Sequence, residues 1–498
     1  MHRITNCRPW PLHGVAATRA IEAAAQATLP SHTLMQRAGL AVARLALAVA
    51  PHARTVWIAC GPGNNGGDGL EAAARLTAMG KAVVVTWLAS ETAPPEDAAA
   101  SLARARAAGV RFADAPPQGL TASDLAIDAL LGIGSRRAPE GRMAQWIAAL
   151  NAGPAPVLAV DLPSGLDADR GTFAATGDAT DAARSGGQVL ARHTLCLLTL
   201  KPGLFTAHGR DAAGQVWLDD LGIAPAASLP LARLLGQPAP TPRDHATHKG
   251  SFGDVAVIGG AAGMAGAALL AGQAALHGGA GRVLVGLLDP AALPVDPGQP
   301  ELMLRRWDSL PLGALSVVCG CGGGEAVRDA LPAVLHGAAG LVLDADALNA
   351  IAADTALQAL LQGRGRRKAG TTVITPHPLE AARLLGCGTR EVQADRLQAA
   401  QALAERFGCT AVLKGSGSVV ASPGELPAIN PTGNARLATA GTGDVLAGLT
   451  GALMAQGHGA PAAACAAVWR HGRVADTWPE GAGLSASALA RALGGWGG

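Results

Sequence analysis

Short apolar segments without polar alternation recur along this chain, and glycine or an acidic residue directly follows several of them. Examples are TVWIAC (residues 55–60), AVVVTWL (82–88) and PVLAV (156–160), with alanine-rich stretches of helical character between them. Strands that are apolar on both sides need a cover on both faces, which a parallel sheet between two layers of helices provides. The pattern therefore predicts an α/β layered fold.

The same pattern returns in the second half, in DVAVIGG (254–260), RVLVGLL (282–288), LSVVCG (315–320) and GLVLDADAL (340–348). The chain has 498 residues, and one hydrophobic core usually serves no more than roughly 250 to 300. A proline-rich stretch separates the two halves. We therefore expect a first domain at 1–224, a Pro/Ala-rich linker at 225–247 and a second domain at 248–498.

Charge and cysteine content exclude several classes of protein. The net charge is +2, with 39 basic and 37 acidic side chains, so neither nucleic acid nor an anionic membrane is an expected partner. Residues 255–281 contain no Asp, Glu, Lys or Arg, but their glycines indicate a strand, a loop and a helix rather than a membrane span.

The eight cysteines are too sparse for a disulfide framework, which favours a reducing, cytoplasmic location. The alanine-rich composition suits a homo-oligomer.

The motif GPGNNGGDG (61–69) follows one of these strands and precedes a helix, where backbone N–H groups bind anions. Asp128, and Asp161 with Ser164, follow two further strands, whose carboxyl ends meet at one crevice in a doubly wound sheet. Asn65, Asp128 and Ser164 could supply oxygen ligands to a hard cation. A tight turn, helix capping or an Asx turn is the alternative interpretation of each motif.

Together with DLPSGLDAD (161–169), this motif resembles the YjeF-type NAD(P)H-hydrate epimerases over about residues 21–221. The resemblance implies a Rossmann-like fold and a K⁺ ion held by Asn65, Asp128 and Ser164. Gln36 in LMQRAG (34–39) stands where that family has Glu. Contacts to the hydrated dinucleotide (NADHX or NADPHX) are implied for Asn64, Asn65, Gly66, Gly67, Asp68, Gly132, Ile133, Gly134, Ser135, Arg136, Arg137, Ala138 and Asp161.

The expected reaction of this half interconverts the R and S forms of a reduced nicotinamide that carries a hydroxyl at C6. Loss and re-addition at that carbon require a group that moves a proton, and a crevice that orients the ring. We expect the Asp161 carboxylate to be that catalytic group.

In the second half, GTGDVLAG (441–448) opens an apolar helix, so the Thr442 and Gly443 amides would face an anion beside Asp444. An anion site next to a carboxylate suits phosphoryl transfer to a hydroxyl, and an Asp-capped helix is the alternative. KGSGS (414–418) offers a cation and N–H groups for a nucleotide phosphate. In LDADALN (343–349), Asp344, Asp346 and Asn349 are candidate Mg²⁺ or water ligands, or helix caps.

These motifs, with TPHPLE (375–380) and PELM (300–303), resemble the ribokinase-like, ADP-dependent NAD(P)H-hydrate dehydratases over about residues 248–493. That family usually shows GPGLG where residues 320–324 read GCGGG, and often Gly where Ala440 stands. The resemblance implies ADP as phosphoryl donor, with Mg²⁺, and Asp444 as the catalytic base. It implies substrate contacts at Ala267, Gly322, His377 and Asp444, and contacts to ADP or AMP at Lys414, Gly415, Ser416, Gly417, Ser418 and Gly443.

The expected second reaction phosphorylates the C6 hydroxyl of the S hydrate, after which phosphate leaves and the ring double bond is restored. One alternative is a ribokinase-like kinase of a small alcohol with an N-terminal dinucleotide-binding sensor module. The fusion of two repair-type halves favours a bifunctional enzyme over that reading. The preference for ADP or ATP, and for NADHX or NADPHX, stays open.

Overall fold

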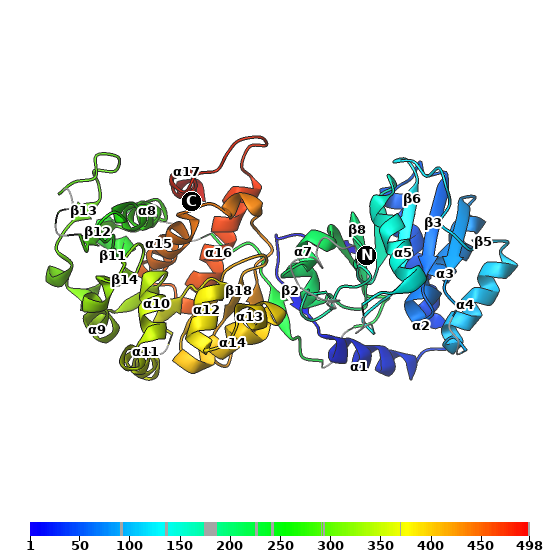
Figure 1. Cartoon of the computed structure of the whole chain (residues 1–498), viewed down its shortest axis with the longest axis horizontal. Helices are drawn as coiled ribbons and strands as arrows, with labels where there is room; N and C mark the ends of the chain where they lie inside the picture. Colours follow the sequence, from blue (N-terminus) through cyan, green and yellow to red (C-terminus); the bar gives the residue numbers. More distant parts are fainter. Residues whose placement is uncertain are drawn as a thin grey trace. The chain divides into compact units, whose positions relative to one another are not determined.

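The computed structural model describes residues 1–89, 93–134, 138–173, 187–224, 228–240, 244–289, 291, 294–368 and 370–496 (Figure 1). The chain divides into two compact units. Unit 1 contains Met1–Thr5 and Trp10–Ala232, and unit 2 contains Asn6–Pro9 and Arg233–Gly498. The division falls inside the stretch expected to be a linker, in which the short strand β10 (Ala232–Leu234) also lies.

The sheet of unit 1 is parallel except at β1, which pairs antiparallel with β9. Its strands, in spatial order, are β1 (His2–Arg3), β9 (Gln215–Asp219), β8 (His193–Leu197), β7 (Val157–Val160), β6 (Leu125–Ala129), β3 (Thr55–Cys60), β4 (Ala82–Trp87) and β5 (Arg111–Ala113). The predicted parallel arrangement is confirmed.

Alternate residues of β3 pack on opposite faces of this sheet, as the period of a strand requires. Val56 and Ile58 belong to a core shared with α2 (Thr33–Val49), α3 (Asn64–Ala78) and α4 (Glu96–Ala107). Trp57 belongs to a second core, shared with α5 (Gly141–Ala152). Helices on both faces explain why this strand is apolar throughout.

The sheet of unit 2 is parallel from β13 to β17, and β18 and β19 extend it antiparallel. Sequence reasoning did not anticipate this mixed end. The spatial order is β13 (Met303–Leu304), β12 (Arg282–Leu287), β11 (Asp254–Gly259), β14 (Ser316–Cys319), β15 (Gly340–Leu343), β16 (Thr372–Ile374), β17 (Thr410–Leu413), β18 (Val419–Ala421), β19 (Ala428–Ile429) and β10.

Two groups of helices cover the faces of this second sheet (Figure 1). Val257, Val318 and Val342 share a core with the first group, which contains α8 (Ala265–His277), α15 (Thr442–Ala455), α16 (Ala460–Asp476) and α17 (Ala486–Ala492). The second group contains α9 (Val327–Gly337), α10 (Asp346–Ala353), α11 (Thr355–Arg367), α12 (Pro378–Leu385), α13 (Thr389–Ala394) and α14 (Arg396–Phe407). The prediction of an α/β layered fold is confirmed here too.

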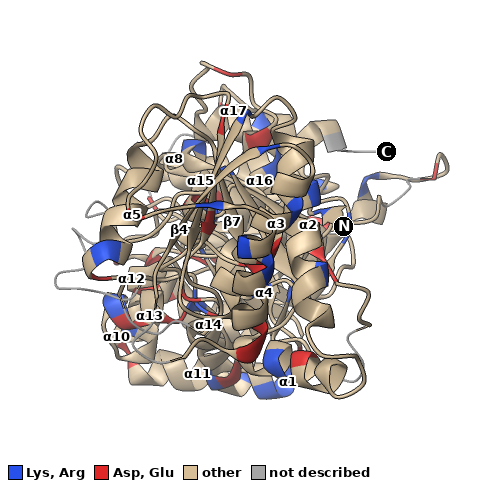
Figure 2. Cartoon of the chain, turned by 90° about the vertical axis from the view of Figure 1, so that its right-hand side faces the viewer, with Lys and Arg blue, Asp and Glu red and all other residues tan. Residues whose placement is uncertain are grey.

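Residues 255–281 form β11, a glycine loop and α8, as predicted. None of the described helices combines the length and the apolar character needed to cross a membrane. All eight cysteines are free. In Figure 2, the ribbon segments of acidic residues (red) and basic residues (blue) are interspersed along the helices, in agreement with the near-zero net charge.

Candidate functional site

The glycine motif of unit 1 is partly helical. Helix α3 begins at Asn64, so only residues 61–63 form the loop that follows β3, whereas the sequence suggested a loop through Gly69. A Cβ at Gly61 would lie 1.8 Å from the Leu130 carbonyl oxygen, so a side chain is excluded there. This close approach sets the start of α3, whose first N–H groups have no partner within the helix.

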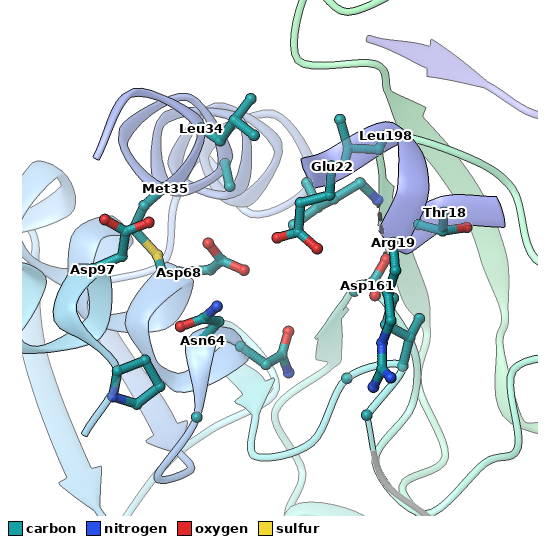
Figure 3. Close-up of a pocket in the computed structure, with 18 of the residues that line it drawn as sticks. Thr18, Arg19, Glu22, Leu34, Met35, Asn64, Asp68, Asp97, Asp161 and Leu198 are labelled. Atoms are coloured by element: carbon teal, nitrogen blue, oxygen red, sulfur yellow. Dashed lines mark hydrogen bonds between the residues drawn. The ribbon is translucent and has the colours of Figure 1, made fainter. Parts of the chain in front are cut away.

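A cavity of about 430 Å³ lies beside this helix N-terminus (Figure 3). Seven of the predicted substrate-binding residues line it: Asn64, Asn65, Asp68, Gly132, Ile133, Gly134 and Asp161. Gly66 and Gly67 are buried in α3, and they and Ala138 are not among the described residues that line the cavity. Ser135, Arg136 and Arg137 lie outside the described residues. Gln36 does not line the cavity, although its neighbour Met35 does.

Asp161, at the end of β7, forms a buried ion pair with Lys201 on the cavity wall. The Lys201 side chain is 0% exposed, and its Nζ also donates to the Leu197 carbonyl oxygen at 2.9 Å. Asp161 adopts the left-handed backbone region with φ +67°, and its Oδ1 accepts the Leu197 N–H at 3.2 Å. The carboxylate is therefore held in one orientation by a cation and an amide. Sequence reasoning missed Lys201, although a lone lysine in the apolar run LLTLKPGLF (197–205) was a signal for it.

Three further carboxyl groups, those of Glu22, Asp68 and Asp97, line the same cavity. Glu22, from α1 (Val15–Gln26), and Asp68 point toward one another (Figure 3). Burial raises the pKa of both, and the Asp161 charge adds to the effect. Arg19 and Lys201 are the cationic side chains among the described lining residues. Sequence reasoning had not singled out Glu22 or Arg19.

The predicted cation ligands Asp128 and Ser164 are in direct contact. Ser164 Oγ donates to Asp128 Oδ1 at 2.6 Å, and the Ser164 N–H donates to Oδ2 at 2.8 Å. Asp128 is completely buried, and burial raises its pKa to about 6. Asn65 lies beside Gly132, and its buried Nδ2 has no hydrogen-bond partner in the described structure. A buried carboxylate, a hydroxyl and an amide oxygen form a donor set that suits a hard cation.

In unit 2, the fold brings together predicted residues from distant segments. The Lys414 ammonium, after β17, bonds Asp344 Oδ1, after β15, at 2.6 Å. A Cβ on Gly443, at the start of α15, would lie only 3.4 Å from Lys414 Nζ, so the cation adjoins the N-terminus of that helix. Burial alone would lower the pKa of Lys414, but Asp344 and Glu380 raise it, and the lysine stays charged.

Asp444 stands in the first turn of α15 beside this pair. Its carboxylate, Asp344 and the Cys321 thiol present ligand-type atoms within 4.8 Å of one another. Burial and the Asp344 charge raise the pKa of Asp444 to about 6. A carboxyl group with that pKa is ionised at neutral pH and can still accept a proton, as a general base requires.

The residues between β15 and α10 are strained. Ala345, between Asp344 and Asp346, has φ +51° and ψ −115°, a backbone conformation that residues other than glycine rarely adopt. Asp346 Oδ2 accepts the Gly324 N–H at 2.9 Å, and Asn349 Oδ1 accepts from Arg383 at 2.7 Å. In this structure Asp344, Asp346 and Asn349 each bond a different protein partner.

The remaining predicted substrate contacts of unit 2 are His377, Gly322 and Ala267, the last of them in α8. His377 caps α12, since its Nδ1 accepts the N–H groups of Leu379 and Glu380 at 3.1 and 3.3 Å. Its Nε2 lies 3.2 Å from Glu380 Oε1, and burial raises the pKa of Glu380 to about 7. A Cβ on Gly322 would lie 2.8 Å from the Ala267 side chain, so these two predicted substrate contacts adjoin.

Gly415 to Ser418 form the turn between β17 and β18, beside Lys414. Arg396 supports this turn from α14. Its guanidinium is buried and donates to the carbonyl oxygens of Leu413 and Lys414 at 3.2 and 3.1 Å. No feature of the sequence indicated this role of Arg396, because the role depends on the packing of α14 against β17.

Comparison with known proteins adds independent information. A family model described as YjeF-related protein N-terminus matches residues 31–203, and one described as NAD(P)H-hydrate dehydratase matches residues 255–494. The bifunctional NAD(P)H-hydrate repair enzyme Nnr of Escherichia coli is 39% identical over 480 residues, which cover 91% of this chain and 87% of that protein.

The corresponding enzyme of Coxiella burnetii is 35% identical and covers 92% of this chain and 93% of its own length. The ADP-dependent (S)-NAD(P)H-hydrate dehydratase of Neisseria meningitidis is 46% identical over 251 residues, 49% of this chain and 83% of that protein. Full-length similarity to bifunctional enzymes sets aside the alternative of a small-alcohol kinase with a sensor module. The chain belongs to the family of bifunctional NAD(P)H-hydrate repair enzymes and is an NAD(P)H-hydrate epimerase joined to an NAD(P)H-hydrate dehydratase.

Proposed function

We propose that residues 1–224 carry the epimerase reaction in the cavity of unit 1, with Asp161 as the catalytic group. The buried Asp161–Lys201 pair on the cavity wall is the observation that carries this assignment. Lys201 holds the carboxylate in place and can share a proton with it while the C6 centre of the hydrate opens and closes. Asn64, Asp68 and the 132–134 segment surround the remaining space and orient the dinucleotide.

Asn65, Asp128 and Ser164 are proposed to hold a K⁺ ion in the same unit. The fit rests on the fully buried Asp128 carboxylate, for which no cationic side chain supplies compensation in the described structure. A bound K⁺ supplies positive charge near the substrate. The protein residues themselves fix the 130–134 segment, because the Leu131 N–H donates to Ser164 Oγ at 2.9 Å.

Residues 248–498, which follow a proposed linker at 225–247, are proposed to dehydrate the S hydrate with ADP as phosphoryl donor. The juxtaposition of Lys414, Gly443 and Asp444 carries this proposal. Lys414 and the first amides of α15 stabilise negative charge on the transferred phosphoryl group, and Asp444 accepts the C6 hydroxyl proton. The P–O bond to AMP breaks as the new bond to the C6 oxygen forms. Phosphate then leaves C6 with the bonding electrons, the adjacent ring carbon loses a proton to water, and the ring double bond returns.

ADP is proposed to contact Lys414, residues 415–418 and Gly443. The hydrate is proposed to contact Ala267, Gly322, His377 and Asp444. Mg²⁺ would enter with the nucleotide phosphates and neutralise part of their charge. Asp344, Asp346 and Asn349 stay its candidate ligands, and each also bonds a protein partner. The free cysteines support a cytoplasmic location, and a homo-oligomer stays a prediction.

Racemic NADH hydrate tests both halves at once. The purified chain is given the racemate with ADP, with ATP or with no nucleotide, and the absorbance of reduced nicotinamide is followed. Recovery of the whole racemate with ADP supports both assignments. Enzyme-dependent recovery that stops at the S half contradicts an active epimerase, and no recovery with either nucleotide contradicts the dehydratase.

A further inference from the structure

A cavity of about 390 Å³ lies at the carboxyl ends of the parallel strands β12 and β13. Its wall includes Leu288 and Asp289, which follow β12, and Arg305, which follows β13. Gly322 and Lys414 follow two other strands of the same sheet, so the cavity and the proposed dehydration site lie along one edge. Ligands of open α/β sheets bind at this edge. The cavity is therefore placed where part of a substrate can bind.

The loop after β11 joins this cavity to the proposed hydrate contacts. On one side of the loop, the N–H of Asp289 in the cavity wall donates to the Gly260 carbonyl oxygen at 3.2 Å. On the other side, the Ala261 N–H donates to the Gly322 carbonyl oxygen at 2.7 Å. The cavity and the place proposed for the C6 end of the hydrate therefore adjoin the same short loop.

The strand order separates the cavity from the place proposed for ADP. Lys414 follows β17, which is four strands from β11, whereas the cavity adjoins β12 on the other side of β11. A dinucleotide whose reacting ring lies beside Gly322 and Asp444 can therefore extend past the β11 loop, in the direction away from ADP. The half of the dinucleotide that does not react needs a place on that side.

The side chains of the cavity match the three chemical parts of an adenosine phosphate. The Trp307 ring offers a flat surface on which a base can stack. The Arg305 guanidinium can bond a phosphate, and the Asp289 carboxylate can accept ribose hydroxyl groups. Arg306, the next residue, bonds Asp308 at 2.6 Å, but Arg305 bonds no carboxylate in the described structure. The charge of Arg305 is therefore available to a ligand.

Backbone packing holds the two ligand-type side chains in place. The Arg305 N–H donates to the Val285 carbonyl oxygen of β12 at 3.0 Å. A Cβ on Gly286 would lie 2.8 Å from the Trp307 Cβ and 2.9 Å from its Cα, so a side chain at 286 would collide with this segment. Glycine in β12 thus lets the 305–307 segment pack against the strand and line the cavity at a fixed place.

We propose that this cavity binds the adenosine phosphate half of the hydrate, with Trp307 against the adenine ring and Arg305 on the phosphate. The inference rests on the proposed dehydration of a dinucleotide in unit 2, and it assigns the part of that substrate which does not react. Contacts to a non-reacting part hold the substrate and the transition state equally well. Their loss should therefore raise KM for the hydrate and leave kcat unchanged.

The test is steady-state dehydration of the S hydrate of NADH by the full-length protein at saturating ADP. Trp307→Ala should raise KM for the hydrate about fivefold to a hundredfold, and Trp307→Phe, which keeps a ring, should restore most of the affinity. Arg305→Gln should raise KM about threefold to tenfold. Arg282→Gln is the matched control for this loss of charge, because Arg282 begins β12 at its opposite end and pairs with Asp254.

The S hydrate of reduced nicotinamide mononucleotide, which lacks the adenosine phosphate half, sharpens the test. Its kcat/KM should be the same in the wild-type protein, in Trp307→Ala and in Arg305→Gln. An equal loss with both hydrates, or an unchanged KM for the NADH hydrate in both variants, would overturn the inference. A rise in KM for ADP alone would also overturn it, because the cavity would then bind the phosphoryl donor. If the wild-type protein recovers no NADH with ADP, the proposed function itself fails.

Discussion

Each of the two sites contains a lysine–aspartate pair, but the paired carboxylate has a different place in each. In unit 1, Asp161 bonds Lys201 and itself faces the cavity. In unit 2, Lys414 bonds Asp344, and Asp444 next to them has no such bond to the lysine. The proposed proton-transfer group is thus the paired carboxylate, Asp161, in unit 1. In unit 2 it is Asp444, the carboxylate next to the pair.

A lysine next to a carboxylate can therefore support two kinds of proton chemistry. Lys201 lies in direct contact with Asp161 and holds that carboxylate in place at the cavity wall. A carboxylate beside the pair experiences the Asp344 charge as well as burial, so it accepts a proton near neutral pH. That property suits a one-way step in which a hydroxyl loses its proton.

The largest expected effect separates the two bases. Asp444→Asn should reduce ADP-dependent recovery of NADH from the S hydrate by about 10²- to 10⁴-fold, because the amide cannot take the hydroxyl proton. The rate of R/S interconversion, measured by separating the isomers, should not change. Asp354→Asn is the matched control, because Asp354 only caps α11 and asparagine caps equally well. Loss of both reactions in Asp444→Asn would show that the halves act as one site.

Breaking the unit 1 pair should affect stability and epimerisation together. Lys201→Met leaves the Asp161 charge buried without its cation, and we expect a loss of about 3–5 kcal/mol in the unfolding free energy of this unit. The double variant Asp161→Asn with Lys201→Met should recover much of that stability and still not epimerise. Thermal unfolding with an isomer-exchange assay checks both points. A double variant that epimerises normally would remove the pair from the reaction.

The pH dependence of dehydration should reflect the unpaired base. Asp444 must be ionised to accept a proton, so kcat/KM should be retained above its pKa of about 6 and fall about tenfold per unit below it. Initial rates with the S hydrate and ADP across pH 5 to 8 measure this limb. A flat profile through pH 5 would contradict a base with a raised pKa at this position.

The smallest expected effect concerns the cation of unit 1. K⁺ at about five times its dissociation constant should raise the unfolding free energy by about 1 kcal/mol, because it compensates the buried Asp128 charge. Na⁺ at equal ionic strength is the control for screening. Asp128→Asn should abolish the difference between the two salts, and a K⁺ effect of equal size in that variant would place the ion elsewhere.

The strands and motif positions were predictable because they depend on local sequence. β3 has the predicted ends, and Asp161, Asp444 and Lys414 follow strands or open a helix as expected. The ion pairs were not predictable, because Lys201 lies 40 residues from Asp161 and Lys414 lies 70 residues from Asp344. Only the strand order, with β8 beside β7 and β17 two strands from β15, brings them together.

Other differences have equally specific causes. The early start of α3 depends on the approach of Gly61 to Leu130, which follows a different strand. The antiparallel end of the second sheet consists of β18 and β19, strands of three and two residues, which are too short to show a pattern. His377 caps a helix through a side-chain geometry that its neighbours do not reveal.

The strained backbone at Ala345 has a consequence for how this enzyme can change over time. A glycine there would adopt the same φ and ψ without strain, and the chain would gain stability at the expense of a looser connection between Asp344 and Asp346. Larger or β-branched residues would make the conformation still less favourable. Position 345 thus tolerates few amino acids. Substitutions there should accumulate slowly during evolution, even though the side chain of alanine is a single methyl group.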